Sequence, residues 1–177
     1  MAHPLSNRWG WFFAWGLLLV ALGTLAIIYS AATTLISVFV FGVILTISGF
    51  VIILDSFKSS WGTWNEFFMH LGMGILYLIA GIILIKGPLA GSITLTLILA
   101  ILYIVLGIFR IVSCLTREVT NRGWRLASSI LTLLLGIFIL AEWPMSGLFI
   151  IGLFIGIDLI FTGWIYIVTA LTARSMK

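Results

Sequence analysis

The fold is decided by residues 9–54, which read WGWFFAWGLLLVALGTLAIIYSAATTLISVFVFGVILTISGFVIIL and contain no charged side chain. A transmembrane helix needs about 20 predominantly apolar residues, so this stretch is long enough for two spans. The segment best suited to a reversal is YSAATT, residues 29–34, near the middle of the stretch. The sequence therefore predicts two membrane-spanning helices with the chain folded back between them.

The composition of the whole chain agrees with a membrane protein. Of 177 residues, 63% are hydrophobic and 8% are charged, whereas a soluble domain carries about 25% charged residues. The sequence contains no GxSxG motif, no phosphate-binding loop, no cluster of His and Cys and no run of basic residues, and Cys114 is its single cysteine. We therefore expect no enzyme activity, no cofactor or metal, and no nucleic-acid partner.

Further apolar runs complete the set of spans. Charge-free segments cover residues 67–85 and 87–109, on either side of the sequence Lys86-Gly87-Pro88, and residues 126–141. A last run, residues 143–173, is interrupted by one charge, Asp158. Such runs are too long for membrane strands of about 10 residues and lack their alternation. The prediction is an all-α protein with six transmembrane helices, in which Pro88 and Pro144 open helices.

The basic residues indicate the orientation of the spans. An even number of spans places both termini on one side, and only Lys86 then falls on the other side. The terminus side carries Arg8, Lys58, Arg110, Arg117, Arg122, Arg125, Arg174 and Lys177. The positive-inside rule then predicts that both termini are cytoplasmic.

The chain contains a threefold internal repeat. Ser30, Pro88 and Pro144 are 58 and 56 residues apart, and the repeats are helical hairpins at approximately 9–54, 64–113 and 124–171 within a single domain, 1–177. Every expected helix carries two small residues seven positions apart, on one face: Gly16 and Gly23, Gly42 and Gly49, Gly74 and Gly81, Ala100 and Gly107, Ser129 and Gly136, and Gly156 and Gly163. Small residues let helices approach closely in lipid, so we expect these stripes to be packing seams in a pseudo-threefold bundle.

One further pair of glycines has two interpretations. Gly152 and Gly156 form a GxxxG motif, which serves either an internal seam or a contact between subunits.

The pattern resembles the HdeD family of bacterial inner-membrane proteins. The matching residues are Gly81-Ile82-Ile83-Leu84 before Pro88, Gly107-Ile108-Phe109-Arg110, Gly123-Trp124, and Gly156-Ile157-Asp158-Leu159-Ile160 before Gly163. The resemblance extends over nearly the whole chain and is looser before Trp64. It implies a role in acid resistance at the inner membrane and no settled molecular activity, and family members often carry Glu at the position of Asp158.

Asp158 is the most informative polar residue. It lies 14 residues after Pro144, or about 21 Å along a helix, where an ionised carboxylate costs about 2.5–3.5 kcal/mol. It is either a proton-responsive group or a carboxyl that hydrogen-bonds neighbouring hydroxyls and fixes its helix. Tyr103 is expected at nearly the same depth and His70 about 6 Å deeper toward the cytoplasm. Both are candidate partners, and Thr162 completes a candidate polar route.

Two charges at the cytoplasmic boundary have a structural interpretation. Glu66 and Arg110 are each 22 residues from Pro88 on opposite legs of one expected hairpin, so they either form an ion pair or are solvated separately.

Three functions remain open at this point. The first is a non-enzymatic inner-membrane protein that contributes to acid-stress tolerance. The second is a channel or transporter for protons or a small solute, lined by Asp158, Tyr103, Thr162 and His70. The third is an accessory subunit of a larger membrane complex. The expected partners are membrane lipids, with a second copy of the chain or another membrane protein as further alternatives.

Overall fold

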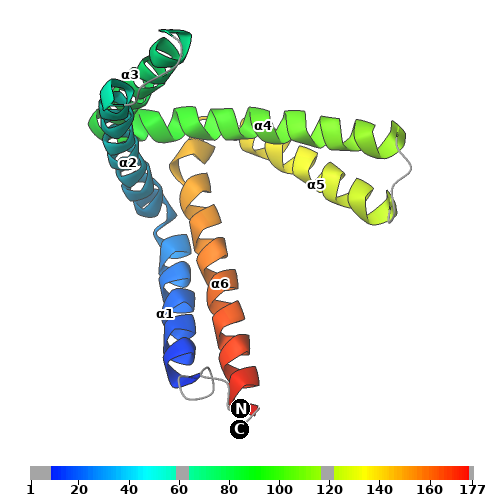
Figure 1. Ribbon diagram of the computed structural model, residues 1–177. Helices are drawn as coiled ribbons and strands as arrows, with labels where there is room; N and C mark the ends of the chain where they lie inside the picture. The colour runs from blue at the N-terminus through cyan, green and yellow to red at the C-terminus, as the bar shows by residue number, and fades with distance from the viewer. Residues whose placement is uncertain (1–8, 59–63, 117–121, 176–177) are drawn as a thin grey trace. The chain divides into compact units, whose positions relative to one another are not determined.

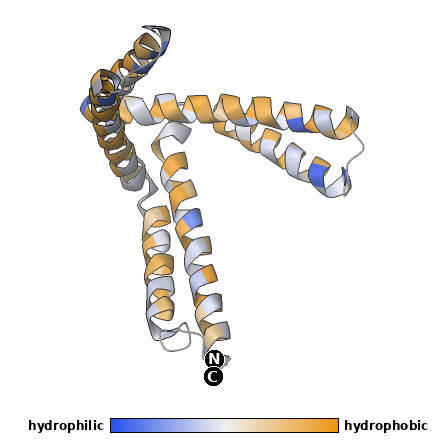
Figure 2. Cartoon of the chain, viewed as in Figure 1, coloured by the Kyte–Doolittle hydropathy of each residue, from blue (hydrophilic) through white to orange (hydrophobic). Residues whose placement is uncertain are grey.

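The computed structural model describes residues 9–58, 64–116 and 122–175; Arg8, Arg117 and Lys177 lie outside these ranges. The α-helices are α1 (Trp9–Ile28), α2 (Ser30–Lys58), α3 (Trp64–Lys86), α4 (Pro88–Thr116), α5 (Arg122–Ala141) and α6 (Ile150–Ser175), and a 3-10 helix, η2 (Met145–Leu148), precedes α6. All six α-helices are long and apolar enough to cross a membrane, as the hydropathy colouring in Figure 2 shows. The predicted all-α fold with six spans is confirmed.

The helices also satisfy the hydroxyl groups that they carry. In lipid, backbone and side-chain polar groups must find partners within the protein. The hydroxyl groups of Thr24, Thr46 and Thr169 donate hydrogen bonds of 2.6–2.8 Å to the carbonyl oxygens four residues earlier in their own helices. Most threonines and serines of the spans therefore add little polarity to the helix surface.

The chain divides into two compact units. The first unit combines α1, the start of α2 up to Thr34, and α6 from the C-terminal half of the chain. The second unit comprises residues 35–148, which hold the rest of α2, α3, α4, α5 and η2.

Close packing joins the helices in three antiparallel pairs. In the first unit α1 runs along α6, and in the second unit α4 runs along α5 (Figure 1). The third pair is α2 with α3, whose contacts run from Gly42 beside Gly81 to Gly49 beside Gly74. The prediction that the six helices form three similar pairs is thus confirmed.

The seams contain the small residues that the sequence analysis selected. A methyl group added at Gly16 would lie 2.8 Å from the carbonyl oxygen of Gly163, and one at Gly23 would lie 2.7 Å from that of Gly156. The corresponding distance is 2.7 Å from Gly49 to Gly74 and 3.0 Å from Gly136 to Ala100. Helix backbones are therefore in direct contact. In lipid, burying apolar side chains between helices gains little free energy, so this close packing stabilises the pairs.

The helices that pair in these seams are not the two helices of one expected repeat, whose bounds are 9–54, 64–113 and 124–171. In each case the first helix of a repeat packs on the return helix of the preceding repeat: α3 on α2, α5 on α4, and α1 on α6. Five residues connect α2 to α3 and α4 to α5, so these paired helices are consecutive in the chain. The third pair, α1 with α6, joins the first helix to the last.

The junctions between α1 and α2 and between α3 and α4 have helical hydrogen bonding. The expected reversal at residues 29–34 is replaced by continued helical bonding, from Tyr29 N–H to the Leu25 carbonyl and from Thr33 N–H to the Tyr29 carbonyl, both 2.9 Å. Gly87 and Gly91 likewise donate to carbonyls four residues earlier, at 3.0 and 2.8 Å. The backbone therefore keeps helical hydrogen bonds through both junctions.

The two prolines begin helices differently. Pro88 is the first residue of α4, as predicted, where its missing N–H costs nothing. Pro144 instead follows a cis peptide bond and precedes η2, and α6 begins six residues later, at Ile150. The predicted start of the last helix at Pro144 is therefore corrected, and the intervening turn is held by Trp143, whose indole N–H lies 3.3 Å from the Ile93 carbonyl.

Candidate functional site

Asp158 lies in the first unit, on α6, with its side chain exposed. It follows Gly156 of the seam by two residues, or about 200° around the helix, so it is on the face turned away from α1. Because α6 begins at Ile150, Asp158 is about 12 Å along the helix rather than 21 Å. This depth still falls inside a hydrocarbon layer about 30 Å thick.

The carboxyl group has no hydrogen bond or ion pair within the described residues of the first unit. Thr162 is half-buried and stands one turn further along the same face. The interpretation of Asp158 as a group fixed by neighbouring hydroxyls therefore has no support within this unit. An ionised carboxylate on this face would cost about 2.5–3.5 kcal/mol in lipid, so protonation or a partner from outside the unit is required.

The other polar candidates belong to the second unit. His70 is exposed on α3, and Tyr103 is half-buried on α4. The structure therefore places Asp158 and Thr162 together on one helix face, and places His70 and Tyr103 on separate helices of the other unit.

Glu66 and Arg110 are not brought together. Both side chains are exposed, near the start of α3 and in the last third of α4, and no ion pair joins them in the described part of the chain. The prediction assumed that α3 and α4 form one hairpin, whereas α3 packs on α2 and α4 packs on α5. The described residues therefore show two exposed, unpaired side chains in place of the ion pair.

The buried polar groups that the sequence analysis did not select lie at the helix junctions. The backbone N–H of Gly152 donates a 2.8 Å hydrogen bond to Oγ1 of Thr34, and the Ser146 hydroxyl donates one of 2.8 Å to the Ile139 carbonyl. The signal that could have revealed them is their spacing, because both hydroxyls come within four residues of the repeat anchors Ser30 and Pro144.

Thr96 is a different kind of buried polar residue. It is fully buried, and its hydroxyl has no hydrogen-bond partner among the described residues. The equivalent positions of the other repeats are Val38 and Gly152, so the repeat does not require a hydroxyl there.

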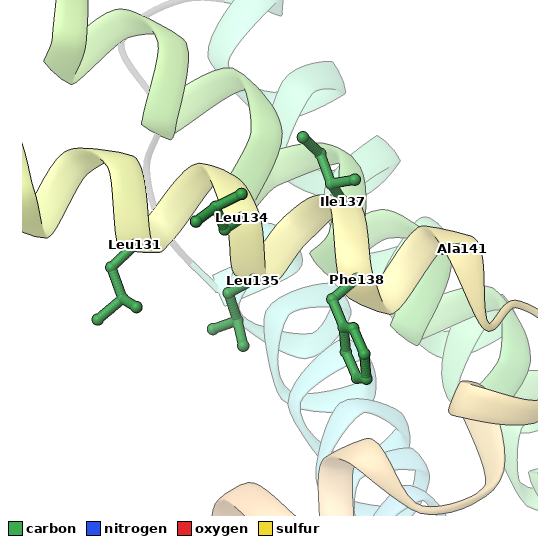
Figure 3. Close-up of a pocket in the computed structure, with 6 residues that line it drawn as sticks. All are labelled: Leu131, Leu134, Leu135, Ile137, Phe138 and Ala141. Atoms are coloured by element: carbon green, nitrogen blue, oxygen red, sulfur yellow. The ribbon is translucent and has the colours of Figure 1, made fainter.

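The two hollows on the surface differ in chemistry. One of about 470 Å³ lies on α5 alone, where Leu131, Leu135 and Phe138 point to the same side (Figure 3). Its lining is aliphatic and aromatic, which suits lipid chains and offers no group for catalysis. The other lies between α1 and α6 and has aromatic walls.

The chain matches the model of one known protein family twice. A family described as a short repeat of unknown function, DUF308, matches residues 14–86 and again residues 72–141. The chain belongs to the DUF308 family. The two DUF308 matches begin 58 residues apart, which equals the spacing of Ser30 and Pro88 and confirms the internal repeat.

The extent of the DUF308 repeat agrees with the helix pairing. The first match covers most of α1, all of α2 and α3, and the second runs from α3 to the end of α5. Each DUF308 match therefore contains one complete seam, α2 with α3 or α4 with α5. No curated protein and no solved structure matches the chain.

Proposed function

We propose that this DUF308 protein is a non-enzymatic protein of the bacterial inner membrane that contributes to acid-stress tolerance through Asp158. The observation that carries the proposal is the exposed carboxyl of Asp158 on the seam-free face of α6, in a span whose other residues from Ile150 to Ala173 are uncharged. The resemblance to the HdeD family supports the same role.

Protonation is the chemical event that acid would cause at this group. An ionised Asp158 is costly against lipid, whereas the protonated form loses that cost. Acidification therefore changes which surroundings the outer face of α6 prefers, lipid or a polar partner. Such a change in preference is a means of coupling acidity to the packing of the membrane protein.

The proposed orientation makes the site accessible to external acid. With both termini in the cytoplasm, α6 enters the membrane from the outer side, and Asp158 is about 12 Å from its start. The antiparallel pairs support this orientation, because the basic residues of the helices, apart from Lys86, lie at the ends that would face the cytoplasm: Lys58, Arg110, Arg122, Arg125 and Arg174.

Survival of acid challenge tests the proposal. A host strain that lacks the protein is complemented with the wild type, Asp158→Asn, Asp158→Glu or Asp55→Asn, with membrane levels matched by immunoblot. Asp55 is the control, because it is an exposed carboxyl near the end of α2. We expect Asn at position 158 to abolish protection and the other two variants to retain it; equal protection by the Asp158→Asn variant would refute the proposal.

The channel function has one observation in its favour, the shared face of Asp158 and Thr162. Purified protein in liposomes, subjected to a pH step, distinguishes it from the first proposal. Proton flux that Asp158→Asn removes would establish the channel, and tight liposomes would exclude it.

The third candidate function, an accessory subunit of a larger membrane complex, has no observation in its favour. It required a small-residue stripe left free, yet the stripes of all six α-helices lie in the three seams, and Gly152 lies against Ser30 and Thr34. Membrane lipids are the partners that we propose, with a second copy of the chain or another membrane protein as alternatives.

A further inference from the structure

One end of the α1·α6 pair carries an aromatic groove. A hollow of about 380 Å³ is lined by Trp11, Phe12, Trp15 and Leu19 of α1 and by Tyr166 of α6. The rings of Phe12 and Tyr166 stack across the pair with centroids 6.2 Å apart, and those of Trp11 and Trp15 meet edge to face at 6.0 Å. Its lining residues lie at positions 11–19 of α1 and in the second half of α6.

Packing does not require these aromatic residues. The other two pairs have the same seam, and the repeat assigns them different side chains at the equivalent positions. In α2·α3 these are Met69, His70, Met73, Tyr77 and Ile52, and in α4·α5 they are Trp124, Arg125, Ser128, Thr132 and Arg110. A helix pair of this geometry therefore forms without an aromatic groove.

The groove offers hydrogen-bond donors that lack acceptors. The polar side-chain atoms of its lining are the indole N–H groups of Trp11 and Trp15 and the hydroxyl of Tyr166, and none of these has a hydrogen-bond partner in the described ranges. Donors at the boundary of a membrane are satisfied by oxygen atoms of lipid headgroups. A phosphate or ester oxygen is the complementary acceptor.

The sequence that flanks the groove residues carries only basic charges. Residues 1–15 and 164–177 contain Arg8, Arg174 and Lys177 and no acidic residue. Basic residues at the membrane surface attract anionic lipids. A lipid with net negative charge therefore matches both the donors of the groove and the basic residues of the flanking sequence.

We propose that the aromatic groove between α1 and α6 binds one anionic phospholipid of the surrounding bilayer. The headgroup phosphate accepts hydrogen bonds from Trp11, Trp15 and Tyr166, and an acyl chain extends past Leu19 along the pair. This site is independent of the proposed function of Asp158, which lies on the face of α6 turned away from α1.

Lipid binding to the full chain tests the site. The purified protein in detergent is titrated with phosphatidylglycerol or with zwitterionic phosphatidylcholine, and bound lipids are counted by native mass spectrometry. The combined variant Trp11→Phe, Trp15→Phe and Tyr166→Phe keeps the rings and removes the three donors. Its matched control, Trp64→Phe, Trp124→Phe and Tyr77→Phe, removes the same groups from exposed positions elsewhere.

The expected result is a single tight phosphatidylglycerol that the wild type and the control variant bind equally. The groove variant should bind it about tenfold more weakly, since each hydrogen bond contributes modestly. Tyr166→Phe alone, which keeps the stack on Phe12, should lose part of the same affinity. Equal losses in the groove and control variants, or equal affinity for both lipids, would overturn the proposal and leave only a general aromatic belt.

Discussion

The side chain of Thr34 accepts a 2.8 Å hydrogen bond from the backbone N–H of Gly152, and the two residues are 118 positions apart. Gly152 is the third residue of α6, where the N–H groups of a helix have no partner within the helix. Thr34 thus caps the last span from the start of the second one. Because this N–H is buried within the protein, the Thr34 hydroxyl supplies the partner that water cannot.

Replacing Thr34 by Val should destabilise the first unit. The change keeps the shape and removes the acceptor, so a buried N–H is left unsatisfied at a cost of about 1–3 kcal/mol. Reversible unfolding of the purified protein in mixed micelles measures this loss. Thr24→Val is the control, because Thr24 is exposed and bonds within its own helix; the prediction fails if both variants unfold at the same denaturant concentration.

Adding one methyl group should have opposite effects at two glycines of α3. A methyl at Gly81 would lie 2.6 Å from the backbone nitrogen of Thr46, whereas one at Gly72 meets nothing within 4 Å. We expect Gly81→Ala to lower the free energy of unfolding by about 1–3 kcal/mol and Gly72→Ala to raise it by up to about 1 kcal/mol. Thermal unfolding in detergent provides the comparison, and similar effects at both sites would contradict the seam.

The pairing of the first and last helices can be tested by cross-linking. Cysteines at Phe12 and Tyr166, whose rings lie 6.2 Å apart, should react with a short bifunctional thiol reagent in a Cys114→Ser background. The pair Phe57 and Phe67, 5.8 Å apart between α2 and α3, serves as the positive control. Intact mass shows the internal link; a link in the control without one between Phe12 and Tyr166 would refute the α1·α6 pair.

Replacing Asp158 by Leu should leave the fold at least as stable as the wild type. The carboxyl has no partner within its unit, and removing a charge from a span is worth about 2.5–3.5 kcal/mol on insertion scales. The same micelle unfolding assay measures this effect, with Asp55→Leu near the end of α2 as a control. A large loss of stability at position 158 alone would assign Asp158 a structural partner instead of a protonation role.

Particular residues show how far the sequence could predict the site. The twelve small residues were selected by their spacing, and the helix pairs place them in the seams. The predicted depth of Asp158 is too large, because η2 lies between Pro144 and the start of α6 and no sequence signal predicts it. The predicted ion pair of Glu66 and Arg110 is absent from the described residues because it required α3 and α4 to pack on each other, and the sequence does not determine which helices are neighbours.

The sequence by itself determined the spans, the repeat and the packing stripes of this protein. Long uncharged runs have only one stable form in lipid, the helix, and small residues seven apart mark one helix face whatever lies opposite. Only the tertiary structure decided which stripes meet, because all six are chemically alike. One contact that exists only in the folded chain is the hydrogen bond from the Gly152 N–H to the Thr34 hydroxyl, which joins the start of α2 to α6.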